Sequence, residues 1–355
     1  MSLPSPTLRS LAAEAGVSVA TVSFALRNSA EVSLATRDRI QSLARARGYR
    51  PDPHVVKLMH HLRTRAPRRG TANICGLVQR WSDLPQGFDR YIDGLTAGLR
   101  DRAASLGYAF TVLSLDDYPE PAPLQRALVS RGVEGVLLLP MRKSGNLIER
   151  LDWRPFSTVA VTTTVVAPKF NRVIPNQFDN MIRACRELTQ LGCRRIGLAM
   201  SRDWDVRANH RWSGGIAWQN QFGGTEAVIP LIDETPGPNL DAARLVEWLR
   251  RERPDAIIIE ALDYTVIEQA RRAVPELRWP RIVTMSWPNA AADCGIDQRA
   301  ARVGVVAVEI LAGMLARGEK GVPEMANTTV VDGEWVDSRP AAAGVSPTAS
   351  IHESD

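Results

Sequence analysis

The 355-residue sequence predicts a small all-α head followed by a two-lobed α/β body with parallel sheets. Residues 7–49 contain three short helical patterns separated by tight breaks. From residue 74 to residue 331, short apolar runs alternate with amphipathic stretches, which is typical of parallel sheets covered on both faces. About 270 residues of this pattern exceed what one doubly wound sheet usually needs, so two lobes are expected.

The three helical patterns of the head have clear start and stop signals. Thr7 can cap a first helix, since its hydroxyl can accept a hydrogen bond from a helical N–H. Gly16 lies at the break before a second helix that begins near Val19, and Ser33 can cap the third helix. Helix, glycine-containing turn and helix form the helix-turn-helix pattern, which can place its second helix in a DNA major groove. A three-helix bundle with a packing or protein-docking role would show the same pattern.

The charge distribution favours DNA over the docking alternative. Residues 1–70 hold 12 Lys or Arg and 4 Asp or Glu, whereas the remaining residues hold 32 and 35. All excess positive charge of this +5 chain therefore belongs to its N-terminal fifth. A basic head on a slightly acidic body is typical of a nucleic-acid-binding domain joined to another module.

The order of patterns predicts four parts of the chain. Pro51 and Pro53 end the third head helix, and a further amphipathic helix is expected at 54–65. In the body, strands are expected at 74–79, 108–115, 136–139, 158–163, 195–200, 227–231, 256–260, 282–286 and 328–331, and helices at 88–106, 121–130, 176–191, 203–221, 240–251, 265–274 and 300–317. The expected parts are the head (1–52), a connecting helix and linker (53–70), the body (71–340) and a disordered polar tail (341–355), with lobe 1 at about 71–169 and 297–326 and lobe 2 at about 170–296 and 327–340.

Several functional classes are not expected. No apolar run approaches the ~20 residues that span a bilayer, and no signal peptide opens the chain, so a cytoplasmic protein without a membrane partner is expected. The four cysteines form no metal-type cluster and are expected to be free thiols. No phosphate-binding loop, Gly-x-Ser-x-Gly or His-Glu-x-x-His motif appears, and the five histidines form no triad-like set. We therefore expect no enzyme activity, no cofactor and no metal.

The head motifs resemble those of the lactose-repressor (LacI/GalR) family of bacterial transcription regulators. The resemblance rests on Gly16-Val17-Ser18, Thr21-Val22-Ser23, Val32-Ser33, Thr36-Arg37 and Gly48-Tyr49-Arg50-Pro51, and continues in the body at Leu188–Ile196 and Arg211–Gly215. It implies a homodimer that binds operator DNA through the head and the connecting hinge helix. It also implies a body of the periplasmic-binding-protein type I fold, with a small sugar-like effector between the lobes that controls DNA affinity. The expected role is that of a repressor.

The resemblance assigns roles to residues of the head and hinge. Phe24 stands where many members carry an arginine that pairs with guanine, so readout here would depend on apolar contact with thymine methyls. A core or hinge-facing aromatic is the alternative for Phe24. For the hinge helix, the alternative is an ordinary helix packed on the body. The implied DNA-backbone contacts are Thr7, Ser18, Thr21, Ser23, Arg27, Ser33, Thr36 and Arg37; the base-reading residues are Val19, Ala20 and Phe24; the minor-groove hinge residues are Leu58, a wedge between base pairs, and Val55, a dimer contact.

The effector-binding residues follow partly from the resemblance and partly from the expected strands. Arg211 matches the family's pocket arginine, whose guanidinium suits a carboxylate or sugar hydroxyls. Asp263 fits an acidic family position with a one-residue shift, and Asp297 lies near the expected lobe crossing. The last candidates are tryptophans that follow expected strand ends, where open α/β folds bind ligands: Trp81, Trp204 and Trp287. A structural salt bridge for the arginine and core positions for the tryptophans are the alternatives, and a binding protein without DNA regulation is the competing function.

Overall fold

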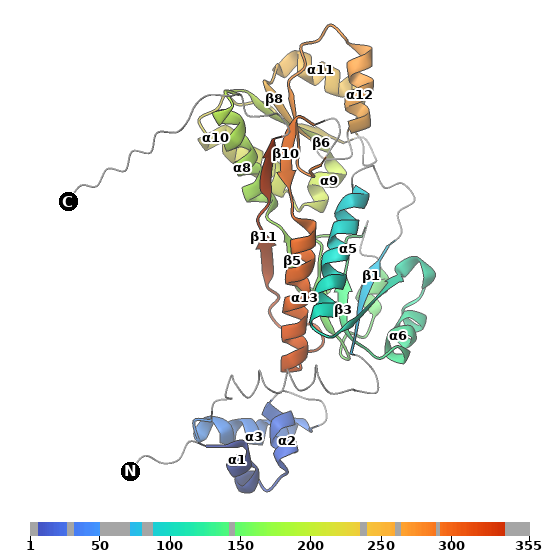
Figure 1. Ribbon diagram of the computed structural model, residues 1–355, viewed down its shortest axis with the longest axis vertical. Coiled ribbons are helices and arrows are strands. Elements are labelled where there is room, and N and C mark those ends of the chain that lie inside the picture. Colours follow the sequence, from blue (N-terminus) through green and yellow to red (C-terminus); the bar gives the residue numbers. More distant parts are fainter. Residues whose placement is uncertain are drawn as a thin grey trace, which may run out of the picture.

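The computed structural model describes residues 6–26, 32–49, 72–79, 88–141, 146–234, 240–259, 264–288 and 292–337 (Figure 1). These ranges form a helical head and a body of two α/β lobes. The expected hinge helix at 54–65 and the tail at 341–355 lie outside the described residues.

The head contains the three predicted helices, α1 (Leu8–Ala15), α2 (Val19–Leu26) and α3 (Leu34–Ala46). Thr7 caps α1 as expected: its hydroxyl accepts from the Ser10 N–H at 3.1 Å, and the Ser10 hydroxyl accepts from the Thr7 N–H at 2.8 Å. Gly16 ends α1 with φ 65°, a conformation that glycine adopts without steric cost. The helices bury a small apolar core made by Leu11, Ala12, Ala15, Val22, Ala25, Val32, Ile40 and Ala44.

Lobe 1 is built on a parallel six-stranded sheet in the order β11-β5-β4-β3-β1-β2. Alternate strand residues face opposite layers: Ile74 packs under α5 and α13, whereas Cys75 packs under α6 and α7. Both faces are therefore covered, as a parallel sheet requires. The elements are β1 (Asn73–Val78), α5 (Phe88–Ser105), β2 (Ala109–Ser114), a 3-10 turn (Leu115–Asp117), α6 (Pro121–Ser130), β3 (Val133–Leu138), α7 (Asn146–Arg150), β4 (Ser157–Ala160), β5 (Asn171–Pro175), α13 (Ala300–Arg317) and β11 (Thr328–Val331).

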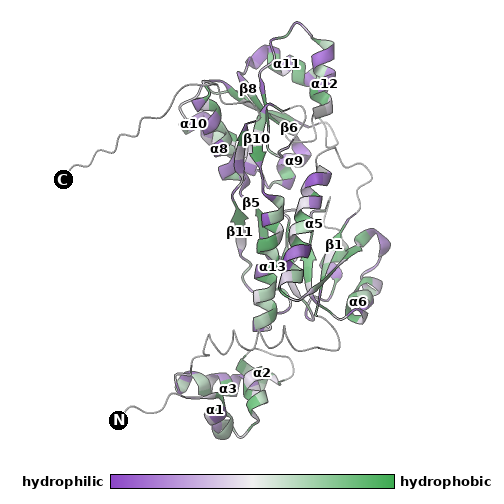
Figure 2. Ribbon diagram, viewed as in Figure 1, coloured by the Kyte–Doolittle hydropathy of each residue, from purple (hydrophilic) through white to green (hydrophobic). Residues whose placement is uncertain are grey.

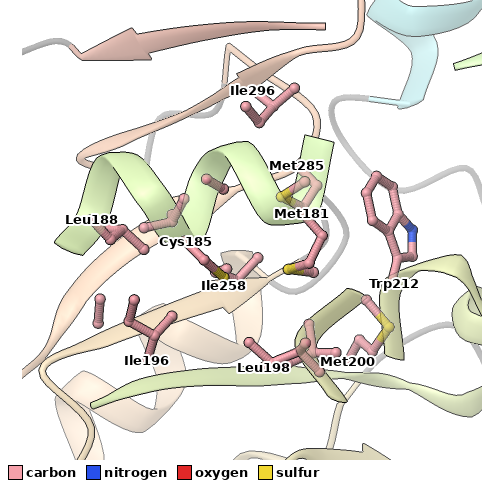
Figure 3. Close-up of a cluster of buried hydrophobic side chains, with 14 of the residues drawn as sticks. Met181, Cys185, Leu188, Ile196, Leu198, Met200, Trp212, Ile258, Met285 and Ile296 are labelled. Carbon is pink, nitrogen blue, oxygen red and sulfur yellow. The ribbon is translucent and has the colours of Figure 1, made fainter. Parts of the chain in front are cut away.

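Lobe 2 repeats this plan with the strand order β12-β10-β9-β8-β6-β7, in which only β12 runs antiparallel to its neighbour. Figure 3 shows one of its cores, where Met181 and Cys185 of α8 meet Leu198 of β6 and Trp212 of α10. The strands are mostly hydrophobic in Figure 2, whereas α8, α11 and α12 carry both kinds of residue, as covering helices do. The elements are α8 (Gln177–Gln190), β6 (Ile196–Ser201), α9 (Arg202–Arg207), α10 (Arg211–Phe222), β7 (Leu231–Asp233), α11 (Ala242–Glu252), β8 (Ala256–Ile259), α12 (Tyr264–Ala273), β9 (Arg281–Thr284), β10 (Cys294–Asp297) and β12 (Glu334–Asp337).

The expected lobe boundaries are wrong by one strand at two places. β5 and β11 pair with each other inside the lobe 1 sheet, so residues 171–175 and 328–331 belong to lobe 1. The chain consequently passes between the lobes three times: from β5 to α8, from β10 to α13, and from β11 to β12. The pairing of these short strands is long-range, so the local pattern could not assign them to a sheet.

The helix expected at 203–221 is in fact two helices. Asn209 and His210 have φ values of 53° and 58°, so the chain turns sharply between α9 and α10. The strand expected at 227–231 instead lies at Leu231–Asp233. Three strands were not expected at all, β5, β10 and β12, because four or five residues containing Pro, Gly or charged side chains have little intrinsic strand preference.

Candidate DNA-binding surface and inter-lobe pocket

Hydroxyl groups of the head gather at the first turns of its helices. Ser18 precedes α2, and its Oγ accepts from the Thr21 N–H at 3.0 Å and lies 2.8 Å from the Thr21 Oγ1. Ser33 caps α3, and its hydroxyl donates to the Thr36 Oγ1 at 2.9 Å. Thr7 holds the same place on α1. Helix N-termini with short hydroxyl donors suit phosphate oxygens, which is the role expected of these residues.

The N-terminal part of α2 presents small apolar side chains. Val19 is 42% exposed and Ala20 is exposed, so both are available for contacts with base edges. Phe24, by contrast, is half-buried and packs against the head core. Partial burial is compatible with both the base-reading role and the core alternative for Phe24. Readout of bases by this ring stays a prediction.

Some basic side chains of the head hold the fold together. The Arg39 guanidinium donates to the Ala15 carbonyl at 3.1 Å, which ties α3 to the end of α1. Arg47 forms an ion pair with Glu14. Arg37 is half-buried and donates to the Val32 carbonyl at 3.4 Å. The expected backbone contacts Thr21, Ser23 and Thr36 are half-buried, and Arg27, like the hinge residues Val55 and Leu58, lies outside the described residues.

A pocket with a cavity volume of about 80 Å³ lies between the two lobes and opens to solvent. Its walls come from both sheets at the carboxyl ends of their strands, where α/β folds usually bind ligands. Lobe 1 contributes Tyr91, Pro140, Val161, Thr162, Thr163, Thr164, Ile174 and Pro175, and lobe 2 contributes Gln177, Trp204, Arg207, Ala208, Trp212, Ser286 and Gln298.

The polar groups of the pocket are held in place by local hydrogen bonds. Thr162 and Thr164 share a hydrogen bond of 2.9 Å between their hydroxyls. The Thr163 hydroxyl donates to the Arg207 carbonyl, so this bond joins lobe 1 directly to lobe 2. The Arg207 guanidinium lies over the Trp204 ring, 4.6 Å from its centroid. The Gln298 amide donates to the Met285 carbonyl at 2.6 Å.

The residues predicted for the effector site are only partly brought together. Trp204 lines the pocket, whereas Arg211, Asp297 and Trp287 are not among its lining residues. The Asp297 carboxylate accepts instead from the Arg299 N–H at 2.7 Å, a local turn contact. For Trp287, the preceding residue Ser286 lines the pocket in its place. Two further candidates, Trp81 and Asp263, lie outside the described residues.

Arg211 is the first residue after the break between α9 and α10. Buried Asp205 accepts from the Ser213 N–H at 3.1 Å and the Ser213 hydroxyl at 2.9 Å, and it lies 2.8 Å from the His210 Nδ1. These contacts begin a new helix, in which the Arg211 guanidinium turns back to the Ala208 carbonyl at 3.0 Å. Arg207, on the preceding helix, lines the pocket instead.

Two further arginines approach each other from opposite lobes. Arg172 on β5 donates to the Val165 carbonyl at 2.9 Å, and Arg211 belongs to the first turn of α10. Burial lowers the pKa of both guanidinium groups, and the positive charge of Arg211 lowers the pKa of Arg172 further. Sequence reasoning missed this pair, because nothing in the local pattern places β5 next to α10.

The head and the body define a class of protein: a helix-turn-helix head joined to a two-lobed α/β body with a pocket between the lobes. Residues 7–52 match the family model for bacterial regulatory proteins of the lacI family. The match covers the head, whose sequence motifs predicted the resemblance to this family.

Two curated relatives are both HTH-type transcriptional regulators. AglR of Rhizobium meliloti (strain 1021) is 29% identical over 194 residues, which are 54% of this chain and 51% of AglR. RafR of Escherichia coli is 26% identical over 132 residues, which are 37% of this chain and 36% of RafR. The chain thus spans between about a third and a half of the length of these relatives.

A solved structure shares the whole fold. The complex of the transcriptional regulator CelR with cellobiose is 20% identical, with a TM-score of 0.55, over 93% of this chain and 98% of that chain. The similarity confirms the predicted combination of a helical head and a two-lobed body. Within the described ranges, no helix is long and apolar enough to cross a membrane, and no group of three or more His, Cys, Asp or Glu side chains is placed to hold a metal ion.

Proposed function

We propose that the protein is a homodimeric transcriptional repressor whose affinity for a specific operator is controlled by a small effector bound between the lobes. One observation carries the proposal: the same chain holds a lacI-family DNA-binding head and a body whose pocket is lined by both lobes. A ligand that touches both lobes stabilises one arrangement of the lobes over others, which is what coupling to DNA affinity requires.

The dimer follows from how such heads read DNA. A single head with α2 in the major groove contacts few base pairs, so two heads on adjacent half-sites supply the affinity and specificity of an operator. The exposed Val19 and Ala20 of α2 would then face the bases, and the hydroxyls of Ser18 and Ser33 would bind phosphates. The expected hinge contacts of Leu58 and Val55 belong to the same proposal.

A sugar or sugar derivative is the proposed effector. Two indole rings and a phenol line the pocket, at Trp204, Trp212 and Tyr91, and flat aromatic faces suit the apolar faces of sugar rings. Threonine, serine and glutamine side chains supply the hydrogen-bonding groups that hydroxyls need. The structural neighbour CelR was solved with cellobiose, which supports this class of ligand.

The proposal is tested by selecting operator sequences from random duplex DNA and measuring their affinity by fluorescence anisotropy. We expect a preferred, two-fold symmetric sequence, and at least a roughly fivefold change in its affinity when the effector is added. A head variant, Ser18→Ala with Ser33→Ala, should weaken binding to preferred and random DNA alike, because phosphate contacts carry little sequence information.

The competing function is a small-molecule receptor without DNA regulation. If this competing function is correct, the body binds a ligand, and the protein binds selected and random DNA with equal affinity. That outcome would exclude the repressor role.

A further inference from the structure

The charged lining of the pocket has one sign. Among the described residues that line it, Arg207 is the only charged one, and none is Asp or Glu. A guanidinium is the side chain best suited to bind carboxylate or phosphate oxygens, because it donates two parallel hydrogen bonds. The charged side chain among the described lining residues is therefore basic, which favours a ligand with negative charge.

Arg172 and Arg211 add positive charge beside the pocket. Arg211 bonds to the carbonyl of the lining residue Ala208, and Arg172 bonds to the carbonyl of Val165, next to the lining residue Thr164. Within the described part of the chain, neither guanidinium forms an ion pair with a carboxylate, and the two come from opposite lobes. Like charges brought together at a lobe junction are stabilised when an anion lies near both.

The pocket also has an acceptor to which no described residue donates. The Oε1 of Gln177 is buried and receives no hydrogen bond from any described residue. Leaving a buried carbonyl oxygen unsatisfied costs free energy, which a ligand hydroxyl placed against Gln177 would recover. The ligand that fits these groups thus needs a donor as well as negative charge.

We infer that the effector is a hydroxylated acid, such as a sugar acid or a sugar phosphate, whose anionic group binds Arg207 and whose hydroxyl donates to Gln177. This inference rests on the proposed function and names the class of effector for the same pocket. Arg207 is well prepared for the role, since its guanidinium lies over Trp204 and its backbone is held by Thr163. The anion also reduces the repulsion between Arg172 and Arg211, and so favours approach of the lobes.

Matched pairs of ligands test the charge directly. Isothermal titration calorimetry of the full chain compares glucose with glucuronate and with glucose 6-phosphate, and cellobiose with cellobionate, at one low ionic strength. We expect at least one acid to bind roughly tenfold or more tightly than its neutral partner, as a charge-assisted hydrogen bond predicts. Glucuronate or cellobionate as the tighter ligand identifies a carboxylate effector, and glucose 6-phosphate a phosphate effector. Neutral sugars that bind as tightly as the acids, or no binding by any of these compounds, would overturn the inference.

Variants test the residues. Arg207→Gln should abolish the preference for the acid, measured as the ratio of acid affinity to neutral-sugar affinity in the same variant, and Arg207→Lys should restore part of that ratio. The matched control is Arg202→Gln on the same helix, whose exposed side chain pairs with Glu234 and does not line the pocket. Full acid preference in a folded Arg207→Gln variant would contradict the assignment. If the Arg207→Gln variant does not fold, Arg172→Gln replaces it in the test. Arg172→Gln should weaken the binding of the acid but not that of the neutral sugar, and an unchanged affinity for the acid would contradict the inference.

The two proposals fail in different ways. An acid that binds tightly without changing DNA affinity would refute control by the effector but leave the ligand class standing. A neutral sugar that changes operator affinity as strongly as its acid would refute the ligand class but leave the repressor standing.

Discussion

At the scale of single residues, Asp205 holds the first turn of α10, the helix that begins at Arg211. His210 occupies the N-cap of α10, but its side chain makes no capping hydrogen bond. The Asp205 carboxylate accepts the hydrogen bond from the Ser213 N–H instead. This cap comes from eight residues upstream, so the local sequence gives no sign of it. The family position of Arg211 was recognisable from its motif, whereas the hydrogen bond from its guanidinium to the Ala208 carbonyl was not.

Asp205→Ala should lower the free energy of unfolding by about 2 kcal/mol, because it removes the cap and leaves a helix N–H without its acceptor. Urea denaturation measures the loss. Asp203→Ala, an exposed residue of the same short helix, is the control and should change stability by less than about 0.5 kcal/mol. Equal losses of unfolding free energy in the two variants would show that the contacts of Asp205 do not stabilise the fold.

The cysteines give a prediction for pH. All four are free and buried, and burial raises the pKa of Cys185 to about 12 and those of Cys75 and Cys294 to about 11, from an ordinary value of 9.0. Their contribution to stability is complete below about pH 9 and is lost as pH rises toward these folded-state values, since only the unfolded chain ionises easily. Ellman's reagent at pH 8 should modify no thiol rapidly in the native protein and all four in denaturant. Rapid modification of the native protein would contradict the burial.

At the scale of elements, the helix boundaries that depend on residues close in sequence were predictable. The caps at Thr7 and Ser33 and the break at Gly16 were confirmed, because a cap is made within one helical turn. The strands β5 and β11 were misassigned, since a strand of four or five residues is defined by its partners and not by its own pattern. The break between α9 and α10 was also missed, because it involves contacts of the Asp205 carboxylate that the local pattern does not show.

The crossing of α5 and α13 is close enough to require glycine. A Cβ added at Gly98 would lie 2.1 Å from the Ala301 carbonyl oxygen, whereas one at Gly94 would lie 3.5 Å from the Ala300 side chain. Gly98→Ala should therefore destabilise the protein by about 2 kcal/mol or more through overpacking. Gly94→Ala should be neutral or stabilising by up to about 1 kcal/mol, because alanine favours the helix. Thermal denaturation distinguishes them, and similar melting temperatures would contradict such a close crossing.

At the scale of the whole molecule, the charge of the head and that of the body differ in sign. Residues 1–70 carry an excess of positive charge, and the rest of the chain carries a small negative excess. DNA affinity should therefore fall steeply with salt, with a slope of log K against log salt of roughly −5 or steeper, since each phosphate contact releases a counterion. Binding titrations between 50 and 200 mM KCl measure the slope. A slope near zero would exclude phosphate contacts as the source of affinity.

The three passages between the lobes have a consequence for synthesis on the ribosome. The lobe 1 sheet receives β1 from near the start of the body but β11 from near its end, and α13 covers that sheet only after nearly all of lobe 2 has been made. The head, by contrast, is complete within residues 8–46 and has its own core. A nascent chain would thus carry a folded DNA-binding domain long before either lobe is complete, so the head can contact DNA before the pocket between the lobes exists.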